Sequence, residues 1–390
     1  MDRVGSIRRQ ELRANRATIK KRKKNKMKNI DYSMLCAILV LLFIGIIMVY
    51  SSSSYYALYE HESNNTDFFF IKQIIWSFFG IVGMFITMGI DYHSYKKYTS
   101  TFVAGTIFLL VIVLFVGADI NGARRWIRLG FLSFQPSELA KYVVILYLAM
   151  LIDRGRGKIK EFKSGVLLHL IIAGLFAGLI ILEKNLSITA IIMMVAFIMI
   201  FAGGAKISHL FSIIPIGIVV GAGLIFKESY RLKRLTSFLD PWADPSSDSY
   251  QLIQSLYALG SGGFFGVGLG NSRQKALFMP EPHNDFIFAI IGEEIGLIGC
   301  AVIISIFVFI VIRGTIVAFR AKDNYGYLLA IGIVSVISLQ AIINIAVVTG
   351  SMPVTGVPLP LISYGGTSLV FNLLALGILL NISRQSKEKI

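Results

Sequence analysis

Long apolar runs separated by short polar segments dominate the sequence after residue 30. A helix needs about 20 apolar residues to cross the hydrocarbon core of a bilayer. The runs are continuous rather than alternating, which favours helices over the strands of a β-barrel. The pattern predicts an all-α polytopic membrane protein with ten spans, at residues 32–52, 69–90, 101–116, 136–152, 166–182, 186–202, 210–226, 286–312, 327–348 and 363–382.

Basic residues are concentrated in four polar segments. Residues 1–30 hold twelve Lys or Arg residues, and the other three segments are the loop with Lys96 and Lys97, the loop 154–163 and the loop 313–322. With ten spans, all four lie on the side of the N-terminus. The positive-inside rule makes that side cytoplasmic, so we expect both termini in the cytoplasm and the longest extracellular loop, 227–285, between spans 7 and 8.

This topology divides the chain into three parts. Residues 1–30 are a basic cytoplasmic tail that we expect to be disordered because it lacks large apolar residues. Residues 31–383 form the membrane domain, and residues 384–390 form a short cytoplasmic tail.

Composition excludes a soluble globular class, since 55% of the residues are hydrophobic. The net charge of +16 resides mainly in the N-terminal tail. We interpret it as a topology and membrane-surface signal, and we expect no nucleic-acid partner. Both cysteines lie in apolar runs and are interpreted as packing residues, and no ligand spacing predicts a metal bound by the protein.

Asp285 is the candidate general base. It lies where a polar loop meets a span, an environment that can raise the pKa of a carboxylate toward neutrality. Glu281 and His283 are its candidate neighbours. The alternative is a helix N-cap, because an aspartate directly before an apolar helix can accept from free N–H groups. The two roles are compatible.

Basic residues in the predicted outer loops run against the positive-inside trend and therefore need an external partner. Guanidinium groups bind phosphate oxygens in a bidentate way, so an anionic head group or a diphosphate is the natural ligand. The alternative is pairing with the local acids Asp119, Asp240 and Asp244. The basic residues are Arg124, Arg125, Arg128, Arg273 and Lys275.

Charged residues also occur within or beside the spans. Glu138 and Lys141 are three residues apart, hence on one helix face, and form either a buried ion pair or the lining of a substrate cavity. At least one of the adjacent Glu293 and Glu294 should face a polar interior. We attribute Glu183, at an outer span end, to snorkelling.

The segment 353–366 is rich in proline and glycine and predicts a stiff hairpin entering the last span. Irregular backbone at membrane depth is tolerated where it lines a cavity, and Ser363 is a candidate substrate-binding residue within it. The glycine cluster 260–270 lacks the preceding strand and the lysine of a P-loop, so it does not predict nucleotide binding.

Four long blocks in one order resemble the SEDS family (shape, elongation, division and sporulation), which includes the FtsW, RodA and SpoVE groups. They are NGARRWIRLGFLSFQPSELAK at 121–141, YRLKRLTSFLDPWADP at 230–245, QSLYALGSGGFFGVGLGNSRQKALFMPEPHNDFIFAIIGEEIG at 254–296 and NIAVVTGSMPVTGVPLPLISYGGTSL at 344–369. The DPW and ISYGG parts are more similar to the FtsW/SpoVE branch than to RodA. The chain departs from the family at two places. It reads His283-Asn284-Asp285 where the family often reads H-T-D, and Glu183-Lys184-Asn185 where many members read Q-P-D.

The resemblance implies a peptidoglycan glycosyltransferase that polymerises lipid II at the outer face of the bacterial cytoplasmic membrane, with ten spans. It assigns the essential carboxylate to Asp285 and the polar pair of the fourth span to Glu138 and Lys141. It implies lipid II and an undecaprenyl-diphosphate-linked glycan as substrates and a class B penicillin-binding protein as partner. A divalent cation such as Mg²⁺ or Mn²⁺ could assist the leaving diphosphate, and no organic cofactor is expected.

Two rival functions use the same features. A lipid II flippase would need the same lipid, basic loops and cavity, but it would also need polar residues toward the inner side. A scaffold without chemistry would give no reason for charges inside spans. The polar features of this sequence concentrate at the outer side, which favours the enzyme.

Overall fold

The computed structural model of the chain describes residues 30–59, 65–120, 122–129, 132–243, 245, 249–276 and 278–386. The predicted disorder of tail 1–30 concerns residues that lie, except for Ile30, outside this range, as do residues 387–390 of the C-terminal tail. The helices are α2 (Tyr32–Tyr59), α3 (Phe68–Gly89), α4 (Tyr92–Val116), α5 (Pro136–Arg154), α6 (Leu168–Leu182) with a short π-helix before it (Phe162–Leu167), α7 (Leu186–Ala202), α8 (Ile207–Phe226), α9 (Ser229–Leu239), α10 (Tyr250–Gly262), α11 (Ile287–Phe319), α12 (Asn324–Val348) and α13 (Gly366–Arg384).

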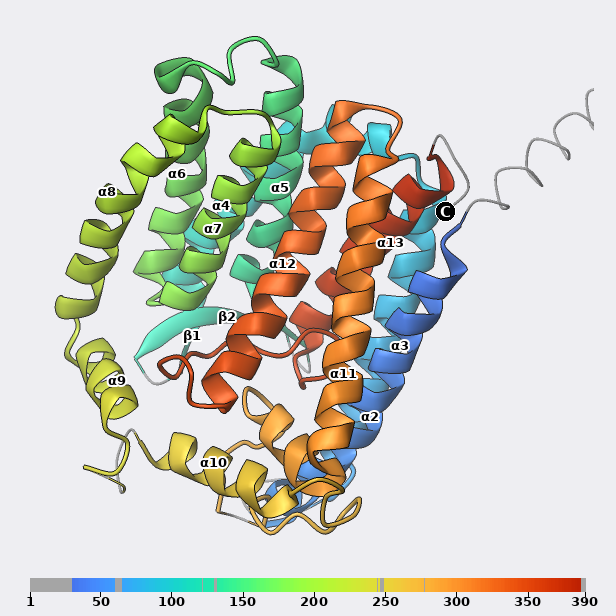
Figure 1. Cartoon of the computed structure of the whole chain (residues 1–390), viewed down its shortest axis with the longest axis vertical. Coiled ribbons are helices and arrows are strands. Elements are labelled where there is room, and N and C mark those ends of the chain that lie inside the picture. Colours follow the sequence, from blue (N-terminus) through green and yellow to red (C-terminus); the bar gives the residue numbers. More distant parts are fainter. Residues whose placement is uncertain are drawn as a thin grey trace, which may run out of the picture.

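The described part of the chain is a helical bundle with two chemically different ends (Figure 1). Both described termini lie at one end, where the Asp31 N–H donates to the Ser383 hydroxyl (3.3 Å). The opposite end, here called the distal end, holds β1–β3, α9, α10 and the segments 263–286 and 349–365. Because both described termini lie together, the chain crosses the bundle an even number of times.

Each of the ten predicted spans coincides with one of these helices. Eight helices are long and apolar enough to cross a bilayer by length and composition. The other two are α7, which has 17 residues, and α5, which carries charged side chains from Glu138 to Arg154. The chain is therefore a helical polytopic membrane protein, as the hydropathy pattern predicts.

Two segments predicted as loops have regular structure. Within 117–135 the described residues form a three-stranded antiparallel sheet of β1 (Ala118–Ile120), β2 (Ala123–Leu129) and β3 (Leu132–Phe134). This sheet is a local addition to a fold whose spans are all helical, as predicted. The longest strand reads ARRWIRL and has no regular alternation of apolar and polar residues. The predicted loop 227–285 contains the helices α9 and α10. The hydropathy pattern did not predict them, because they are short amphipathic helices among polar residues.

The prediction of a loop at Lys96 and Lys97 is also wrong, because both residues lie in helix α4. Helix α4 begins at Tyr92 because the Asp91 carboxylate accepts from the backbone N–H of His93 (3.0 Å). A capped start satisfies free N–H groups of the first turn. The two lysines therefore lie within the first turns of α4.

The helices α12 and α13 form the centre of the bundle. In the most apolar part of each helix, 67% and 72% of the residues are buried, compared with 6% for the peripheral α8. Helix α13 packs closely on α3, where the Thr87 hydroxyl donates to the carbonyl oxygen of Leu374 (2.9 Å). A Cβ at Gly377 would overlap the Thr87 hydroxyl and the carbonyl oxygen of Met84. The missing side chain of Gly377 thus permits the close approach of the two helices.

Replacing Gly377 by Val should separate α3 from α13 and lower stability by about 1–3 kcal/mol, the usual cost of overpacking. The measurement is thermal unfolding of the purified protein in detergent. Gly105→Ala is the matched control, because a Cβ there would meet nothing within 4 Å. Equal unfolding temperatures for both variants would contradict the assignment of Gly377 to a tight helix contact.

Candidate functional site

Asp285 lies in a small pocket at the distal end of the bundle, two residues before the start of α11. The pocket has a volume of about 70 Å³ and is lined by Arg234, Gln251, Pro280, Glu281, Asn284, Asp285, Phe286, Val354, Thr355 and Gly356. Four parts of the chain meet there: helix α9, helix α10, the turn before α11 and the segment before α13. Helix α11 has Phe286 as its N-cap residue, without a side-chain cap bond, so Asp285 does not have the N-cap role given above as the alternative.

The protein around the pocket changes the acidity of Asp285. Burial raises the pKa of its carboxyl from 3.8 to about 7, repulsion from Glu281 adds to the increase, and Arg234 opposes it. Although part of Asp285 remains accessible, the dense surroundings disfavour its ionised form. A group with such a pKa can both accept and return a proton near neutral pH.

Asn344 of α12 binds the backbone of the turn that carries Asp285. The buried Asn344 donates from Nδ2 to the carbonyl oxygens of Asp285 (2.7 Å) and Val357 (2.8 Å). The segment containing Val357 also brings its backbone against the carboxylate, since a Cβ on Gly356 would lie 3.3 Å from Asp285 Oδ2. Asn344 and Gly356 therefore position the carboxylate, and sequence reasoning identified neither of them.

His283 lies on the other side of this turn, among aromatic rings. Its ring centroid is 4.2 Å from that of Phe69, 5.3 Å from Tyr56 and 5.5 Å from Tyr364. The Tyr364 N–H also donates to the carbonyl oxygen of His283 (2.9 Å). These contacts join the turn to α2, α3 and the start of α13. His283 does not line the Asp285 pocket, so its predicted substrate contact stays a prediction.

The two carboxylates of α11 bind the loop that precedes them. Glu293 accepts from the backbone N–H of Arg273 (2.9 Å) and from the Ser272 hydroxyl. Glu294 forms an ion pair with Lys275 Nζ (2.7 Å) and is buried. The prediction that at least one of the two glutamates faces a polar interior is thus confirmed for both.

These contacts bear on two predicted substrate ligands. The Lys275 ammonium is buried and also donates to the Ser51 hydroxyl of α2 (3.0 Å), so its charge is neutralised inside the protein. The side chain of Arg273 is exposed. Neither residue lines the pocket of Asp285.

The three predicted arginines lie on β2, and two of them bind backbone carbonyl oxygens at the ends of α4 and α6. Arg125 donates to the carbonyl oxygens of Glu183 (2.9 Å) and Lys184 (2.7 Å), and Arg124 donates to that of Phe115 (3.3 Å). Arg128 is exposed. Within the described residues none of the three forms an ion pair with Asp119 or Asp240, which weakens the alternative of local acid pairing, and Asp244 lies outside those residues.

A second polar cluster lies at the first turn of α5. Lys141 Nζ is 2.8 Å from Glu138 Oε2, and both side chains are buried, so the predicted pairing on one face is confirmed. Glu183 lies beside this turn. Burial raises the pKa of its carboxyl to about 8, although the nearby Ser137 and Arg125 oppose the increase. The Glu183 side chain is 1% exposed, so its interpretation as a snorkelling residue is wrong.

Ser363 has a local structural contact, since its hydroxyl accepts from the backbone N–H of Leu359 (2.8 Å). It stabilises the turn between the proline-rich segment and α13. The described residues contain no cluster of three His, Cys, Asp or Glu side chains that could hold a metal ion. The divalent cation stays a prediction.

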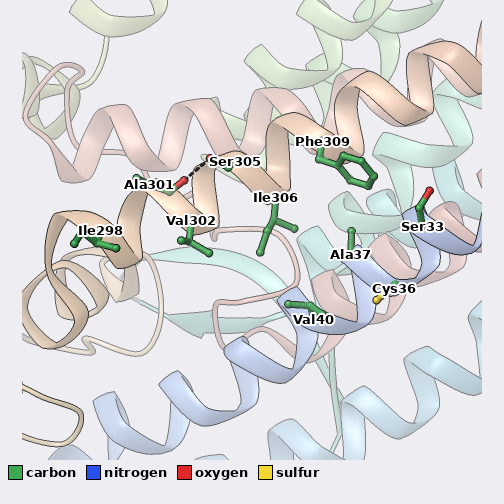
Figure 2. A pocket seen from close by; sticks show the side chains of 10 residues that line it. All are labelled: Ser33, Cys36, Ala37, Val40, Ile298, Ala301, Val302, Ser305, Ile306 and Phe309. Atoms are coloured by element: carbon green, nitrogen blue, oxygen red, sulfur yellow. Dashed lines mark hydrogen bonds between the residues drawn. The ribbon is translucent and has the colours of Figure 1, made fainter. Parts of the chain in front are cut away.

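A larger groove of about 580 Å³ lies between α2 and α11 (Figure 2), and it shares no lining residue with the Asp285 pocket. Its lining consists of small and apolar side chains, among them Ala37, Val302 and Phe309, with the hydroxyls of Ser33 and Ser305 and the thiol of Cys36. The pair formed by Lys275 and Glu294 joins α11 to Ser51 of α2 on its distal side. This groove belongs to the apolar surface of the bundle and offers no acid–base pair.

The fold and its distal pocket define a polytopic membrane protein with a titratable carboxylate at the mouth of its helices. A family model described as "Cell cycle protein" (FTSW_RODA_SPOVE) matches residues 32–388. Stage V sporulation protein E of Bacillus subtilis (strain 168) is 42% identical, over 92% of this chain and 98% of the relative. The probable peptidoglycan glycosyltransferase FtsW of Geobacter sp. (strain M18) is 41% identical, over 92% and 97%.

Two solved structures share the fold at 24% identity. One is a chain described under "Structural coordination of polymerization and crosslinking by a peptidoglycan synthase complex", with a TM-score of 0.77 over 91% of this chain and 98% of that chain. The other is the rod shape determining protein RodA of Thermus thermophilus, with 0.69 over 92% and 98%. The chain belongs to the FtsW/RodA/SpoVE (SEDS) family of multi-pass proteins of the bacterial cytoplasmic membrane, as its motifs predict.

The two charges beside Asp285 should move its pKa in opposite directions. Arg234→Gln removes a cation that stabilises the ionised carboxylate, so the pKa should rise above about 7, and Glu281→Gln removes an anion, so it should fall. The measurement is a pH titration of the infrared carboxyl band that disappears in Asp285→Asn. Shifts in the same direction in both variants would contradict this electrostatic account.

Asn344→Leu keeps the approximate volume of the side chain but removes both donors to the backbone. Buried carbonyl groups left without partners cost about 1–3 kcal/mol, so segments 280–286 and 350–362 should exchange amide hydrogens faster. Hydrogen exchange followed by mass spectrometry measures this. Asn372→Leu, on α13, is the control and should leave both segments unchanged. If Asn344→Leu exchanged amide hydrogens at the parental rate, the two hydrogen bonds of Asn344 would not be needed to hold these segments.

Proposed function

We propose that this chain is a peptidoglycan glycosyltransferase that polymerises lipid II, with Asp285 as the general base. The observation that supports it most is a carboxylate with a pKa near 7 in a pocket that also contains an arginine. Membership of a family whose relatives include probable peptidoglycan glycosyltransferases supplies the reaction class. The related sporulation protein leaves both division and sporulation as settings for the same chemistry.

In the proposed reaction the growing glycan is the donor and lipid II is the acceptor. Asp285 takes the proton of the attacking sugar hydroxyl, and the hydroxyl oxygen forms a bond to the anomeric carbon of the donor. The bond from that carbon to the undecaprenyl diphosphate breaks, and the diphosphate leaves with the electron pair. A single displacement inverts the anomeric centre, from an α-linked donor to a β-linked product.

Negative charge develops on the leaving diphosphate and needs stabilisation. Arg234 is the basic residue among those that line the pocket, and its exposed side chain places its charge at the rim. Arg124, Arg128, Arg273 and the buried Lys141 remain further candidates, as does a divalent cation brought with the substrate. Lys141 and Lys275 are the weakest candidates, because Glu138 and Glu294 already neutralise their charges.

The proposed orientation places the distal end outside the cytoplasmic membrane and both termini in the cytoplasm. The basic segments near the termini support it through the positive-inside rule. In this orientation the pocket meets lipid-linked sugars at the outer surface. A class B penicillin-binding protein, which cross-links strands, is the proposed partner, because a similarly folded chain belongs to a complex described as coordinating polymerization and crosslinking.

A lipid II flippase is less well supported by this arrangement. Transport requires polar side chains along a path through the bilayer, whereas the Asp285 pocket lies at one end of the bundle. The contacts among Lys275, Glu294 and Ser51 also connect α2 and α11 instead of leaving a polar path between them.

The test uses the full chain purified with and without a candidate penicillin-binding partner that lacks glycosyltransferase activity. Labelled lipid II and a divalent cation are added, and glycan strands are separated on a gel. The parent should make long strands, at a rate that rises as the pH increases through about 7, because the base must be ionised. Asp285→Asn should lose activity by about 100-fold or more, since general-base catalysis contributes 10²–10⁴-fold.

Asp240→Asn is the matched control, because this exposed aspartate lies outside the pocket, and it should polymerise at the parental rate. Equal rates for the parent and Asp285→Asn would refute the base assignment. Absence of polymer from the parent, combined with lipid II transfer across vesicle bilayers, would favour the flippase.

A further inference from the structure

The hydroxyl of Thr355 is an unused polar group in the Asp285 pocket. Its Oγ1 atom is buried and makes no hydrogen bond to another described residue, although the residue lines the pocket. A buried hydroxyl without a partner costs free energy unless a ligand or water satisfies it. Gln251 of α10 lines the same pocket and can both donate and accept.

The wall that carries Thr355 is stiff. Pro353 and Pro358 flank it and restrict the backbone, Asn344 holds the carbonyl oxygen of Val357, and Arg234 Nη1 donates to that of Val354 (3.4 Å). The backbone that carries Thr355 is therefore held in place before a ligand arrives, which reduces the entropy lost on binding.

The size and charge of the pocket restrict its ligand. The pocket is small, with a volume of about 70 Å³, which leaves room for only a few hydroxyl-sized groups of a ligand. A diphosphate would bring its negative charge beside Asp285 and Glu281, which opposes its binding at the bottom of the pocket. Two neighbouring neutral hydroxyls on one edge of a sugar fit both the volume and the charge.

We propose that Thr355 binds the acceptor-sugar hydroxyl adjacent to the attacking one, and so makes this pocket the acceptor subsite. This inference rests on the proposed glycosyltransferase function. The attacking hydroxyl donates to Asp285, the adjacent hydroxyl bonds to Thr355, and the pair fixes which sugar oxygen reaches the base. Thr355 is thus a specificity residue of the reaction.

The experiment compares polymerisation of lipid II with that of an analogue that lacks the adjacent hydroxyl on the acceptor sugar. The parent should use lipid II roughly ten-fold better, because loss of one ligand group leaves the Thr355 hydroxyl unsatisfied. Thr355→Val keeps the shape of the side chain and loses its hydroxyl, so the ratio should fall to about one. Thr355→Ser restores a hydroxyl and should restore the preference.

Thr349→Val is the matched control, since this threonine lies at the end of α12 and bonds to the carbonyl oxygen of Ile345 (2.8 Å). It should keep the parental rate and ratio. If Thr355→Val fails to accumulate, Thr355→Ala removes the same hydroxyl and should give the same ratio of about one.

A parental ratio in Thr355→Val or Thr355→Ala, or a parent that uses both substrates equally, would overturn the subsite while the proposed function remains intact. A parent that makes no polymer would overturn the proposed function and this inference with it. The infrared titration of Asp285 should be unchanged in Thr355→Val, because threonine carries no charge, and a shifted pKa would indicate a disturbed pocket instead of a lost ligand contact.

Discussion

The distal end of this protein depends on one side-chain amide that binds the backbone of two separate segments at once. Asn344 donates to the carbonyl oxygens of Asp285 and Val357 from within α12. Both carbonyls belong to irregular backbone next to a bundle in which water is scarce, so each needs a donor. By supplying both donors from one rigid helix, Asn344 sets the distance between the carboxylate and the opposite wall of the pocket.

The same constraint explains the charged residues of α11. Glu293 and Glu294 would be costly at the start of an apolar helix, but Glu293 binds backbone N–H groups of the 272–274 turn and Glu294 binds Lys275. Removing one partner of such a buried pair is far more destabilising than the pair is stabilising. These charges therefore fix a loop in place, and the exposed or pocket-lining charges remain for ligands.

The pocket combines opposing effects on one carboxylate. Burial and Glu281 favour its protonated form, whereas Arg234 favours its ionised form. The resulting pKa of about 7 depends on Arg234 of α9 and on Glu281 of the turn that carries Asp285. Small movements of α9 relative to α11 would change this pKa, which makes the packing of the helices part of the chemistry.

Sequence by itself determined the helical membrane class, the approximate spans, the pair Glu138 and Lys141, and Asp285 as the central candidate. Each follows from a local rule: the length of an apolar run, the spacing along one helix face, or a carboxylate beside a span. It assigned Lys275 to the substrate and Glu183 to snorkelling, because sequence does not reveal which distant group meets a side chain. Only the tertiary structure decided that Glu294 neutralises Lys275, that Glu183 adjoins α5, and that Arg234, Asn344, Thr355 and Gly356 surround Asp285. These residues are up to 122 positions apart, and only the packing of the helices brings them together around Asp285.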